Sequence, residues 1–474
     1  MSSRILLISA NRCTAPDPVF PLGLAYLNAA LRRAGHDCMW LDALSHRAEL
    51  REQVRNFRPD YVGISLRNID DVLIRKQETF FAELTPLIAE LREATTSPII
   101  LGGSGFSIFP RQLFELSGAD FGIVGEGETA LPALVESLSH RADVVAIPGL
   151  VFRHQDRTIV NPPWPHPASE TLLAADRPPS VTAHYLENSR ALNIQTQRGC
   201  AFRCCYCTYP VIEGRQHRRR SAEMVAAEFE QLQQLGARYA FVVDSVFNSS
   251  AAHVTGICEA ILRRNVKIPW GCFLRPQGLS RDLMHLMARA GLTHIEFGSD
   301  SFCDDVLSEY QKDFSFEDIR FSSELARQAG IDFCHYLIAG GPSESQATLL
   351  RTFENSRCLD DPIVIAVVGM RIYPGTALFE RAVVEGRISP DANLLTPHYY
   401  LAPGLQPAQV FQELQGFARR SPNWIVGDPE PSYSDLVARL RRRGLAGPLW
   451  SYLSIIQHIR PSELATGHAA KRRS

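Results

Sequence analysis

Short apolar runs alternate with helical segments over the first 140 residues of the chain. The runs at 4–9, 60–66, 98–101 and 121–124 resemble buried strands, whereas 23–34, 80–93 and 129–138 have the apolar spacing of helices. This alternation predicts parallel βαβ units, and therefore an α/β fold that begins with a doubly wound, Rossmann-like sheet. Ligands of such sheets bind beyond the carboxyl ends of the strands.

A second series of strand-like runs follows a proline-rich stretch. Residues 141–190 include Asn161-Pro-Pro-Trp-Pro-His-Pro and Arg177-Pro-Pro, which are typical of extended connecting chain. Beyond this stretch, helical segments separate six strand-like runs, at 192–196, 239–244, 270–274, 294–298, 333–339 and 363–371. Six βα repeats predict a partial (β/α)6 barrel, with the active residues on loops after the strand ends.

The predicted organisation has four parts: a first domain at 1–140, a linker at 141–190, a partial barrel at 191–385, and a small, mostly helical C-terminal extension at 386–474. The chain has 474 residues, of which 45% are hydrophobic and 21% charged, as in ordinary globular domains. Lys and Arg (49) nearly balance Asp and Glu (51), so no global positive field is present to attract nucleic acid. No apolar run approaches the roughly 18 residues that a membrane span requires. We expect a cytoplasmic protein.

Three cysteines are clustered after the first barrel strand, in Arg198-Gly199-Cys200-Ala-Phe-Arg-Cys204-Cys205-Tyr206-Cys207. Thiolates of Cys200, Cys204 and Cys207 suit three irons of a [4Fe-4S] cluster, which leaves the fourth iron open to an amino and carboxylate ligand. A structural zinc site is the alternative, but zinc prefers four ligands and no second Cys-x2-Cys pair occurs. Cys205 is extra to this spacing.

The cysteine loop and the strand ends that follow it resemble the radical S-adenosylmethionine (SAM) superfamily. Asp244-Ser245 stands where that superfamily carries a Gly-Gly-Glu-like segment, and Ile295 to Ser301 resembles its Gly-x-Glu-Ser motif, with Asp300 in place of Glu. Tyr336 to Glu344 resembles the Gly-x-Pro-Gly-Glu turn, and Tyr373-Pro-Gly-Thr ends the sixth strand. The SAM-binding residues that this resemblance implies are Tyr206, Asp244, Ser245, Glu296, Ser299, Asp300, Tyr336, Gly340 and Gly341.

The first domain resembles the cobalamin-binding domain of class B radical SAM methyltransferases. Glycine-rich turns after two of its strands carry the resemblance, and the segment Pro21 to Leu27 adds to it. A glycine turn lets the backbone approach a flat ligand, although many such turns serve geometry alone. The cobalamin-binding residues that this resemblance implies are Tyr26, Asn68, Gly102, Gly103, Ser104, Gly125, Glu126 and Gly127.

The combined resemblance implies an enzyme that uses a [4Fe-4S] cluster to cleave SAM to a 5'-deoxyadenosyl radical. It further implies cobalamin-dependent methylation of an unactivated carbon in a lipid or natural product, as in hopanoid methylases, with an external one-electron reductant of the flavodoxin or ferredoxin type. The sequence does not identify a catalytic residue, and Tyr373 is the candidate for this role. Two alternatives stay open: a cobalamin-independent radical rearrangement, cyclisation or group transfer with a vestigial first domain, and a non-catalytic iron-sulfur or zinc module.

The C-terminal part of the chain raises a further alternative. The run Arg439-Leu-Arg441-Arg442-Arg443, Trp450 and Lys471-Arg-Arg suit peripheral contact with an anionic membrane where a lipid substrate resides. A solvated basic helix face explains the same charges, because charge runs usually only solvate a surface.

Overall fold

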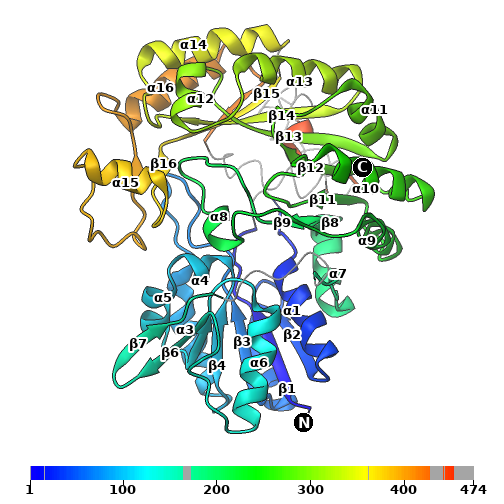
Figure 1. The fold of residues 1–474 in the computed structure, drawn as a ribbon, viewed down its shortest axis with the longest axis vertical. Helices are drawn as coiled ribbons and strands as arrows, with labels where there is room; N and C mark the ends of the chain where they lie inside the picture. Colours follow the sequence, from blue (N-terminus) through cyan, green and yellow to red (C-terminus); the bar gives the residue numbers. More distant parts are fainter. Residues whose placement is uncertain are drawn as a thin grey trace, which may run out of the picture.

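The computed structural model describes residues 2–14, 17–163, 172–360, 362–427, 441 and 444–452. It contains two seven-stranded sheets, one in the N-terminal half of the chain and one in the C-terminal half (Figure 1). The first sheet has the strand order β2-β1-β3-β4-β5-β6-β7. Its strands are β1 (Arg4–Ser9), β2 (Asp37–Asp42), β3 (Tyr61–Ser65), β4 (Ile99–Gly102), β5 (Phe121–Ile123), β6 (Leu150–His154) and β7 (Arg157–Val160).

The five strands β1 to β5 pair in parallel, so the doubly wound sheet expected from the sequence is confirmed. Helices cover both faces: α1 (Leu22–Arg33), α2 (Leu50–Phe57), α3 (Leu84–Arg92), α4 (Ser104–Ile108), α5 (Pro110–Ser117) and α6 (Gly127–Ser139). β2 and α2 were not predicted from the sequence. Nor was the antiparallel hairpin β6–β7, which lies within the segment predicted as a linker and extends the sheet.

The hairpin was missed because its turn lacks the usual glycine. Gln155 and Asp156 both adopt positive φ, 46° and 62°, as a tight two-residue hairpin turn requires. Asn-Gly or Asp-Gly would normally mark such a turn in a sequence, so this pair gave no signal. The predicted linker also contains α7 (Pro179–Asn188).

The second sheet is entirely parallel, in the order β18-β15-β14-β13-β12-β11-β8. Its strands are β8 (Ala191–Ile194), β11 (Tyr239–Val242), β12 (Trp270–Leu274), β13 (Leu292–Asp300), β14 (Asp332–Ala339), β15 (Ile363–Val368) and β18 (Trp424–Val426). The first six correspond to the six predicted strands. The seventh, β18, comes from the C-terminal region and has only three residues, too few for a periodic pattern.

Two short ladders accompany this sheet: β9 (Gln197–Arg198) with β10 (Arg218–Arg219), and β16 (Met370–Arg371) with β17 (Tyr399–Tyr400). Its helices are α8 (Tyr209–Ile212), α9 (Ala222–Gln234), α10 (Ala251–Arg263), α11 (Arg281–Arg289), α12 (Asp304–Glu309), α13 (Phe316–Gln328), α14 (Gln346–Ser356), α15 (Ala377–Val384) and α16 (Pro407–Ala418).

Hydroxyl side chains fix where most of the long barrel helices begin. Each accepts a hydrogen bond from the backbone N–H three residues further on, which satisfies one of the free donors at a helix start. The capping residues are Ser221, Ser250, Ser280, Ser315, Ser345 and Thr376. Helices therefore start where the sequence places these residues after a loop.

The two sheets share a hydrophobic core at their boundary. Phe20 of the first domain packs edge-on against Tyr185 of α7, with ring centroids 5.4 Å apart, and also contacts Trp40 of β2. The Tyr185 hydroxyl donates to Asp42 at 2.5 Å. Loops after the strands of the first sheet thus face the barrel (Figure 1). In the described part of the chain, no helix has the length and apolar character needed to cross a membrane.

Candidate active site

The cysteine loop connects β9 to α8 and is held in place by its backbone. Gly199 has φ of 83°, and a Cβ at this position would overlap the carbonyl oxygen of Gln216. The hydroxyl of Ser245 donates to the Gly199 carbonyl at 3.1 Å, and the Cys200 N–H donates to the Gly214 carbonyl at 3.0 Å. Glycine is therefore required directly before the first cysteine.

Cys200, Cys204 and Cys207 lie on this loop as free thiols that interact electrostatically with one another. Burial raises the pKa of the Cys207 thiol to about 12, and the neighbouring cysteines add to the shift. Among the described residues, no three His, Cys, Asp or Glu side chains converge on a single metal ion. A cubane cluster does not need such convergence, because each thiolate binds a different iron. The donor set of three thiols on one loop fits a [4Fe-4S] cluster.

Cys205 differs from its three neighbours. It is buried in the hydrophobic core, its N–H donates to the Tyr310 carbonyl at 3.1 Å, and its carbonyl accepts from Leu378 at 2.8 Å. The side chain therefore serves packing, as its position outside the cysteine spacing predicts.

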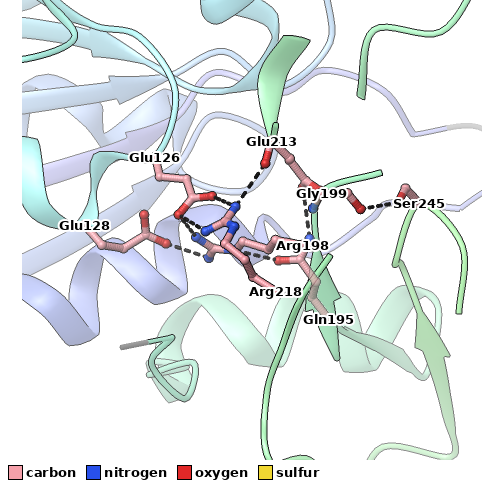
Figure 2. A network of polar contacts seen from close by, with 8 residues as sticks. All are labelled: Glu126, Glu128, Gln195, Arg198, Gly199, Glu213, Arg218 and Ser245. Atoms are coloured by element: carbon pink, nitrogen blue, oxygen red, sulfur yellow. Dashed lines mark hydrogen bonds and ion pairs between the residues drawn. The ribbon is translucent and has the colours of Figure 1, made fainter. Parts of the chain in front are cut away.

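A network of buried charges joins the loop after β5 to the cysteine loop (Figure 2). Arg198 pairs with Glu126 at 3.1 Å and with Glu128 at 2.6 Å, and Arg218 also pairs with Glu126. Glu126 was predicted to bind cobalamin, but the structure engages its carboxylate with these two arginines of the barrel. The network ties the glycine turn of the first domain to the residue that precedes Gly199-Cys200.

Glu213 supports the same network from the barrel side. Its carboxylate accepts from the Gly199 N–H and from the Gln195 amide, both at 3.0 Å. Burial raises the pKa of this carboxyl group above its usual value. Gln195 in turn accepts from Arg198 Nε at 3.0 Å, so the contacts reach Arg198 as well.

Asp300 and Tyr206, both predicted to bind SAM, contact each other. The Tyr206 hydroxyl donates to Asp300 Oδ2 at 2.5 Å, and Lys312 forms an ion pair with the same carboxylate. Burial alone would lower the pKa of Lys312, but the charges of Asp300 and Cys204 outweigh it and raise the pKa. Lys312 therefore stays charged beside the cysteine loop.

Arg275 is a second buried cation at this loop. Its guanidinium carbon lies 3.7 Å from the ring centroid of Phe202, which stands between the first two cysteines. The residue is 5% exposed. Neither Nε nor Nη2 of Arg275 has a hydrogen-bond partner among the described residues.

A cavity of about 1050 Å³ lies where the first domain faces the barrel. All eight residues predicted to bind cobalamin line it. Tyr26 does so from α1, and the other seven do so from the end of β4 or from the loops and helix starts that follow strands of the first sheet: Asn68, Gly102, Gly103, Ser104, Gly125, Glu126 and Gly127. From the barrel it is lined by Asn193, Gln195, Thr208, Tyr209, Ile212, Tyr336 and Tyr373, among others. The volume reaches the upper end of the range that ligand pockets occupy, about 300 to 1000 Å³.

The wall of this cavity fits a large ligand that approaches the backbone. Gly103 has φ of 100°, and a Cβ there would lie 2.5 Å from the Leu66 carbonyl oxygen, so the turn after β4 requires glycine. Two buried polar atoms of the lining residues, the Tyr26 hydroxyl and Asn193 Oδ1, have no hydrogen-bond partner among the described residues. Unsatisfied buried groups of this kind indicate a missing polar partner.

Several predicted SAM-binding residues use their side chains within the protein. Asp244 accepts from the N–H of Thr196 at 2.6 Å and from its hydroxyl at 2.5 Å, and burial raises the Asp244 pKa to about 7. Ser299 hydrogen-bonds the buried ring of His335 at 2.8 Å. In the turn after β14, the Gly341 N–H donates to the Tyr310 hydroxyl at 3.1 Å.

The C-terminal segment supplies a partner for another predicted SAM-binding residue. Trp450 donates to Glu296 Oε1 at 2.9 Å, and Glu296 also bonds Tyr336, which lines the cavity. Trp450 is 6% exposed, so its side chain does not supply the membrane contact that the sequence left open as an alternative. Arg441 is likewise buried and pairs with Asp17, while the other residues of that basic run and Lys471-Arg-Arg lie outside the described residues.

Tyr373, the candidate catalytic residue, lines the same cavity. Its hydroxyl donates to Asp70 at 3.4 Å, and Asp70 also pairs with Arg371 Nε at 2.9 Å. This buried contact is a second link between the first domain and the barrel. It directs the phenol hydroxyl toward the first domain.

Sequence reasoning missed the cations around the site. Arg198 and Arg218 form ion pairs with carboxylates of the first domain. Lys312 and Arg275 belong to no motif that the sequence shows. Arg67 lines the cavity, and no carboxylate among the described residues forms an ion pair with it. Burial lowers the pKa of this guanidinium. No sequence signal identifies such residues, because their partners are distant in the chain.

Two family models match the chain, and each covers one of the two domains. A B12 binding domain model matches residues 8–135, and a Radical SAM superfamily model matches residues 194–355. Tryptophan 2-C-methyltransferase from Streptomyces laurentii is 25% identical over 78% of this chain and 73% of its own length. Hopanoid C-3 methylase from Methylococcus capsulatus is 26% identical over 77% of this chain and 70% of its own length.

A solved structure resembles the whole fold. The radical SAM methyltransferase TsrM from Kitasatospora setae, solved with cobalamin and a [4Fe-4S] cluster bound, aligns with a TM-score of 0.86 at 22% identity over 98% of this chain and 100% of that one. This likeness concerns the fold, and the domain matches agree with it. The chain belongs to the radical SAM proteins that carry a B12-binding domain ahead of the radical SAM domain, and the cobalamin, SAM and [4Fe-4S] cofactors expected from the sequence are those of this family.

Proposed function

We propose that this protein is a cobalamin-dependent radical SAM C-methyltransferase that methylates an unactivated carbon of a lipid or natural product. The observation that carries the proposal is the shared cavity. It is lined by the glycine turns of the B12-binding domain on one side and by Thr208, Tyr209 and Ile212, directly after the cysteine loop, on the other. Groups bound at these two places would face one common space.

The residues proposed for each cofactor follow from their positions. Cys200, Cys204 and Cys207 would hold the cluster. Ser245 contacts the loop that carries these cysteines, and Asp300 contacts Tyr206 within it. The turns Gly102–Ser104 and Gly125–Gly127, with Tyr26 and Asn68, would hold cobalamin. Once bound, the cofactors would supply reductive cleavage of SAM to a 5'-deoxyadenosyl radical and a methyl group for transfer to carbon.

The chain itself would position the reactants and exclude water. Two interdomain contacts, Arg198 with Glu126 and Glu128, and Arg371 with Asp70, hold the first domain against the barrel around the cavity. Fixed geometry of this kind supplies much of the rate gain in radical chemistry, where the cofactors carry the bond-breaking steps. Tyr373 and Tyr336 are the barrel side chains proposed to contact the substrate.

The substrate class rests on two supports. Relatives are named for methylation of tryptophan and of a hopanoid, and both of these molecules contain apolar rings. The cavity presents the aromatic side chains of Tyr209, Tyr336 and Tyr373, and its lining is more apolar than polar, although charged side chains such as Arg67 and Glu213 also line it. A mainly apolar lining with polar groups that fix the orientation suits a ligand that contains apolar rings.

We further propose that the enzyme works in the cytoplasm with an external one-electron reductant of the flavodoxin or ferredoxin type. All eleven cysteines are free thiols, which agrees with a reducing compartment.

Anaerobic reconstitution with iron, sulfide and hydroxocobalamin tests the proposal. Bound iron, corrin absorbance and the products of SAM under a reductant are then measured. Cluster and corrin together, with both S-adenosylhomocysteine and 5'-deoxyadenosine formed, would support methyl transfer. Cluster without corrin, with 5'-deoxyadenosine alone, would contradict the cobalamin-dependent reaction and favour a radical rearrangement or cyclisation.

A further inference from the structure

Arg275 is a buried positive charge, and among the described residues no carboxylate lies within hydrogen-bond distance of it. Its side chain is 6% exposed, and Nη2 lies 3.9 Å from a carboxylate oxygen of Asp313, too far for a hydrogen bond. The Asp313 side chain is 65% exposed, so water screens its charge. A buried cation without a close counter-charge destabilises the protein.

The position of Arg275 is fixed before any ligand binds. Arg275 follows β12 directly, and Asn248 bridges its backbone: the Asn248 amide donates to the Arg275 carbonyl at 2.9 Å, and its oxygen accepts from the Arg275 N–H at 3.0 Å. The guanidinium stacks on Phe202 within the cysteine loop and interacts electrostatically with Cys200. The charge is therefore held beside this loop by the scaffold.

The other cations near the loop do not offer a free buried charge. Lys312 is neutralised by its ion pair with Asp300. Arg203, within the loop itself, is exposed to solvent. Arg275 is thus a buried cation in direct contact with the cysteine loop, and no carboxylate among the described residues lies within hydrogen-bond distance of it. Arg67 also has no ion pair there, but it belongs to the first domain and lines the cavity.

We infer that Arg275 is the counter-ion of the iron-sulfur cluster and raises its reduction potential; this inference rests on the proposed function. Three thiolates give a [4Fe-4S] cluster a net negative charge, and reduction adds one more. A fixed positive charge in a low-dielectric site stabilises the reduced state more than the oxidised one. Arg275 would thereby ease the single-electron reduction that SAM cleavage requires.

Potentiometric EPR titration of the reconstituted full-length chain, without SAM, tests this inference. Dithionite and mediators supply the electron. We expect R275Q to lower the equilibrium constant for cluster reduction at least tenfold, which is 59 mV for a one-electron couple. R275K, which keeps the charge, should stay within threefold of the wild type. The matched control R203Q removes the same charge from an exposed position and should also stay within threefold, because solvent screens it.

Each other result has a defined meaning. Equal potentials for R275Q and R203Q would overturn the inference. An unchanged potential combined with loss of the SAM-induced change in the EPR spectrum would assign Arg275 to the SAM carboxylate instead, and would overturn it as well. If R275Q binds no cluster, R275K decides: a cluster of wild-type potential in R275K supports the need for charge, whereas its absence contradicts it. A wild-type protein that binds no cluster would contradict the proposed function itself.

Discussion

Two groups of buried arginines and lysines border the cysteine loop, and their charge balance differs. At one group, Arg198 and Arg218 meet Glu126 and Glu128 in ion pairs that cross from the barrel to the first domain (Figure 2). At the other, Lys312 is paired with Asp300, but no carboxylate among the described residues lies within hydrogen-bond distance of Arg275. Within the described part of the chain, the first group is therefore balanced in charge, whereas the second has one positive charge that no close carboxylate balances.

We interpret the balanced charges as structural and the unbalanced charge as one that binds a ligand. A complete buried network fixes the relative position of two elements, and breaking it leaves a charge without a partner. A buried charge that no residue balances can be stabilised by a bound ligand of opposite charge. The same residue type therefore has two roles at one loop, and mutation should distinguish them.

The largest loss of activity is expected from substitution of the three cysteines proposed to hold the iron-sulfur cluster, which is the proposed partner of Arg275. Cys200→Ala, Cys204→Ala and Cys207→Ala should each abolish reductive SAM cleavage, because each removes a thiolate ligand of an iron. Cys205→Ala is the matched control and should keep most of the activity, since its side chain packs in the core. Measurement of 5'-deoxyadenosine and bound iron checks this. Equal losses in all four variants, with iron retained, would contradict the ligand assignment.

Removal of Arg198 should give the next largest effect. Arg198→Met leaves Glu126 and Glu128 with one arginine between them, and the side-chain exposures of 10%, 13% and 19% allow little screening. We expect a loss of about 3 kcal/mol in the free energy of unfolding, measured by urea denaturation. Arg263→Met is the control, because its ion pair with Glu223 is exposed and should contribute nothing measurable. Equal behaviour of the two variants would show that the interdomain network is not structural.

The contrast between the two groups also explains what the sequence could predict. The cysteine loop and six barrel strands were predicted because each is a local pattern, a spacing or an apolar run. Asp244 stays a predicted SAM-binding residue, and its hydrogen bonds with Thr196, which lies between β8 and β9, could not be predicted from any motif. The pairs of Arg198 with Glu128 and of Lys312 with Asp300 join residues that share no motif, so no pattern along the chain reveals them.

The missed elements have the same physical cause. The β6–β7 hairpin uses Gln155 and Asp156 where glycine usually marks the turn, and β18 is too short to show alternation. A membrane surface was one alternative for Trp450, and nothing near this residue in the sequence indicates Glu296 as its partner. Local chemistry was predictable, whereas long-range pairing was not.

Glu344 is a buried carboxyl group whose protonation can be compared with the buried cations. It accepts hydrogen bonds from Thr348, Gly340 and Tyr310, and burial raises its pKa to about 7 from an ordinary value of 4.5. The folded state then favours the protonated form. Stability from this group is complete below pH 4.5 and is lost as the pH rises through 7, at no more than about 1.4 kcal/mol per pH unit. Urea denaturation of wild type and Glu344→Gln between pH 5 and 8 measures it. The wild type should lose stability relative to the variant, and parallel curves would contradict this.

The smallest expected effect has the opposite sign from that of Arg198. In the cluster-free protein, Arg275→Met removes an uncompensated buried charge while keeping a side chain that packs on Phe202. We expect the free energy of unfolding to rise by about 1 kcal/mol, measured by anaerobic urea denaturation of the apoprotein. In the reconstituted protein the gain should disappear, because the arginine then has its anion. A destabilisation of the apoprotein as large as that of Arg198→Met would mean that both arginines are structural and that no ligand is needed to balance Arg275.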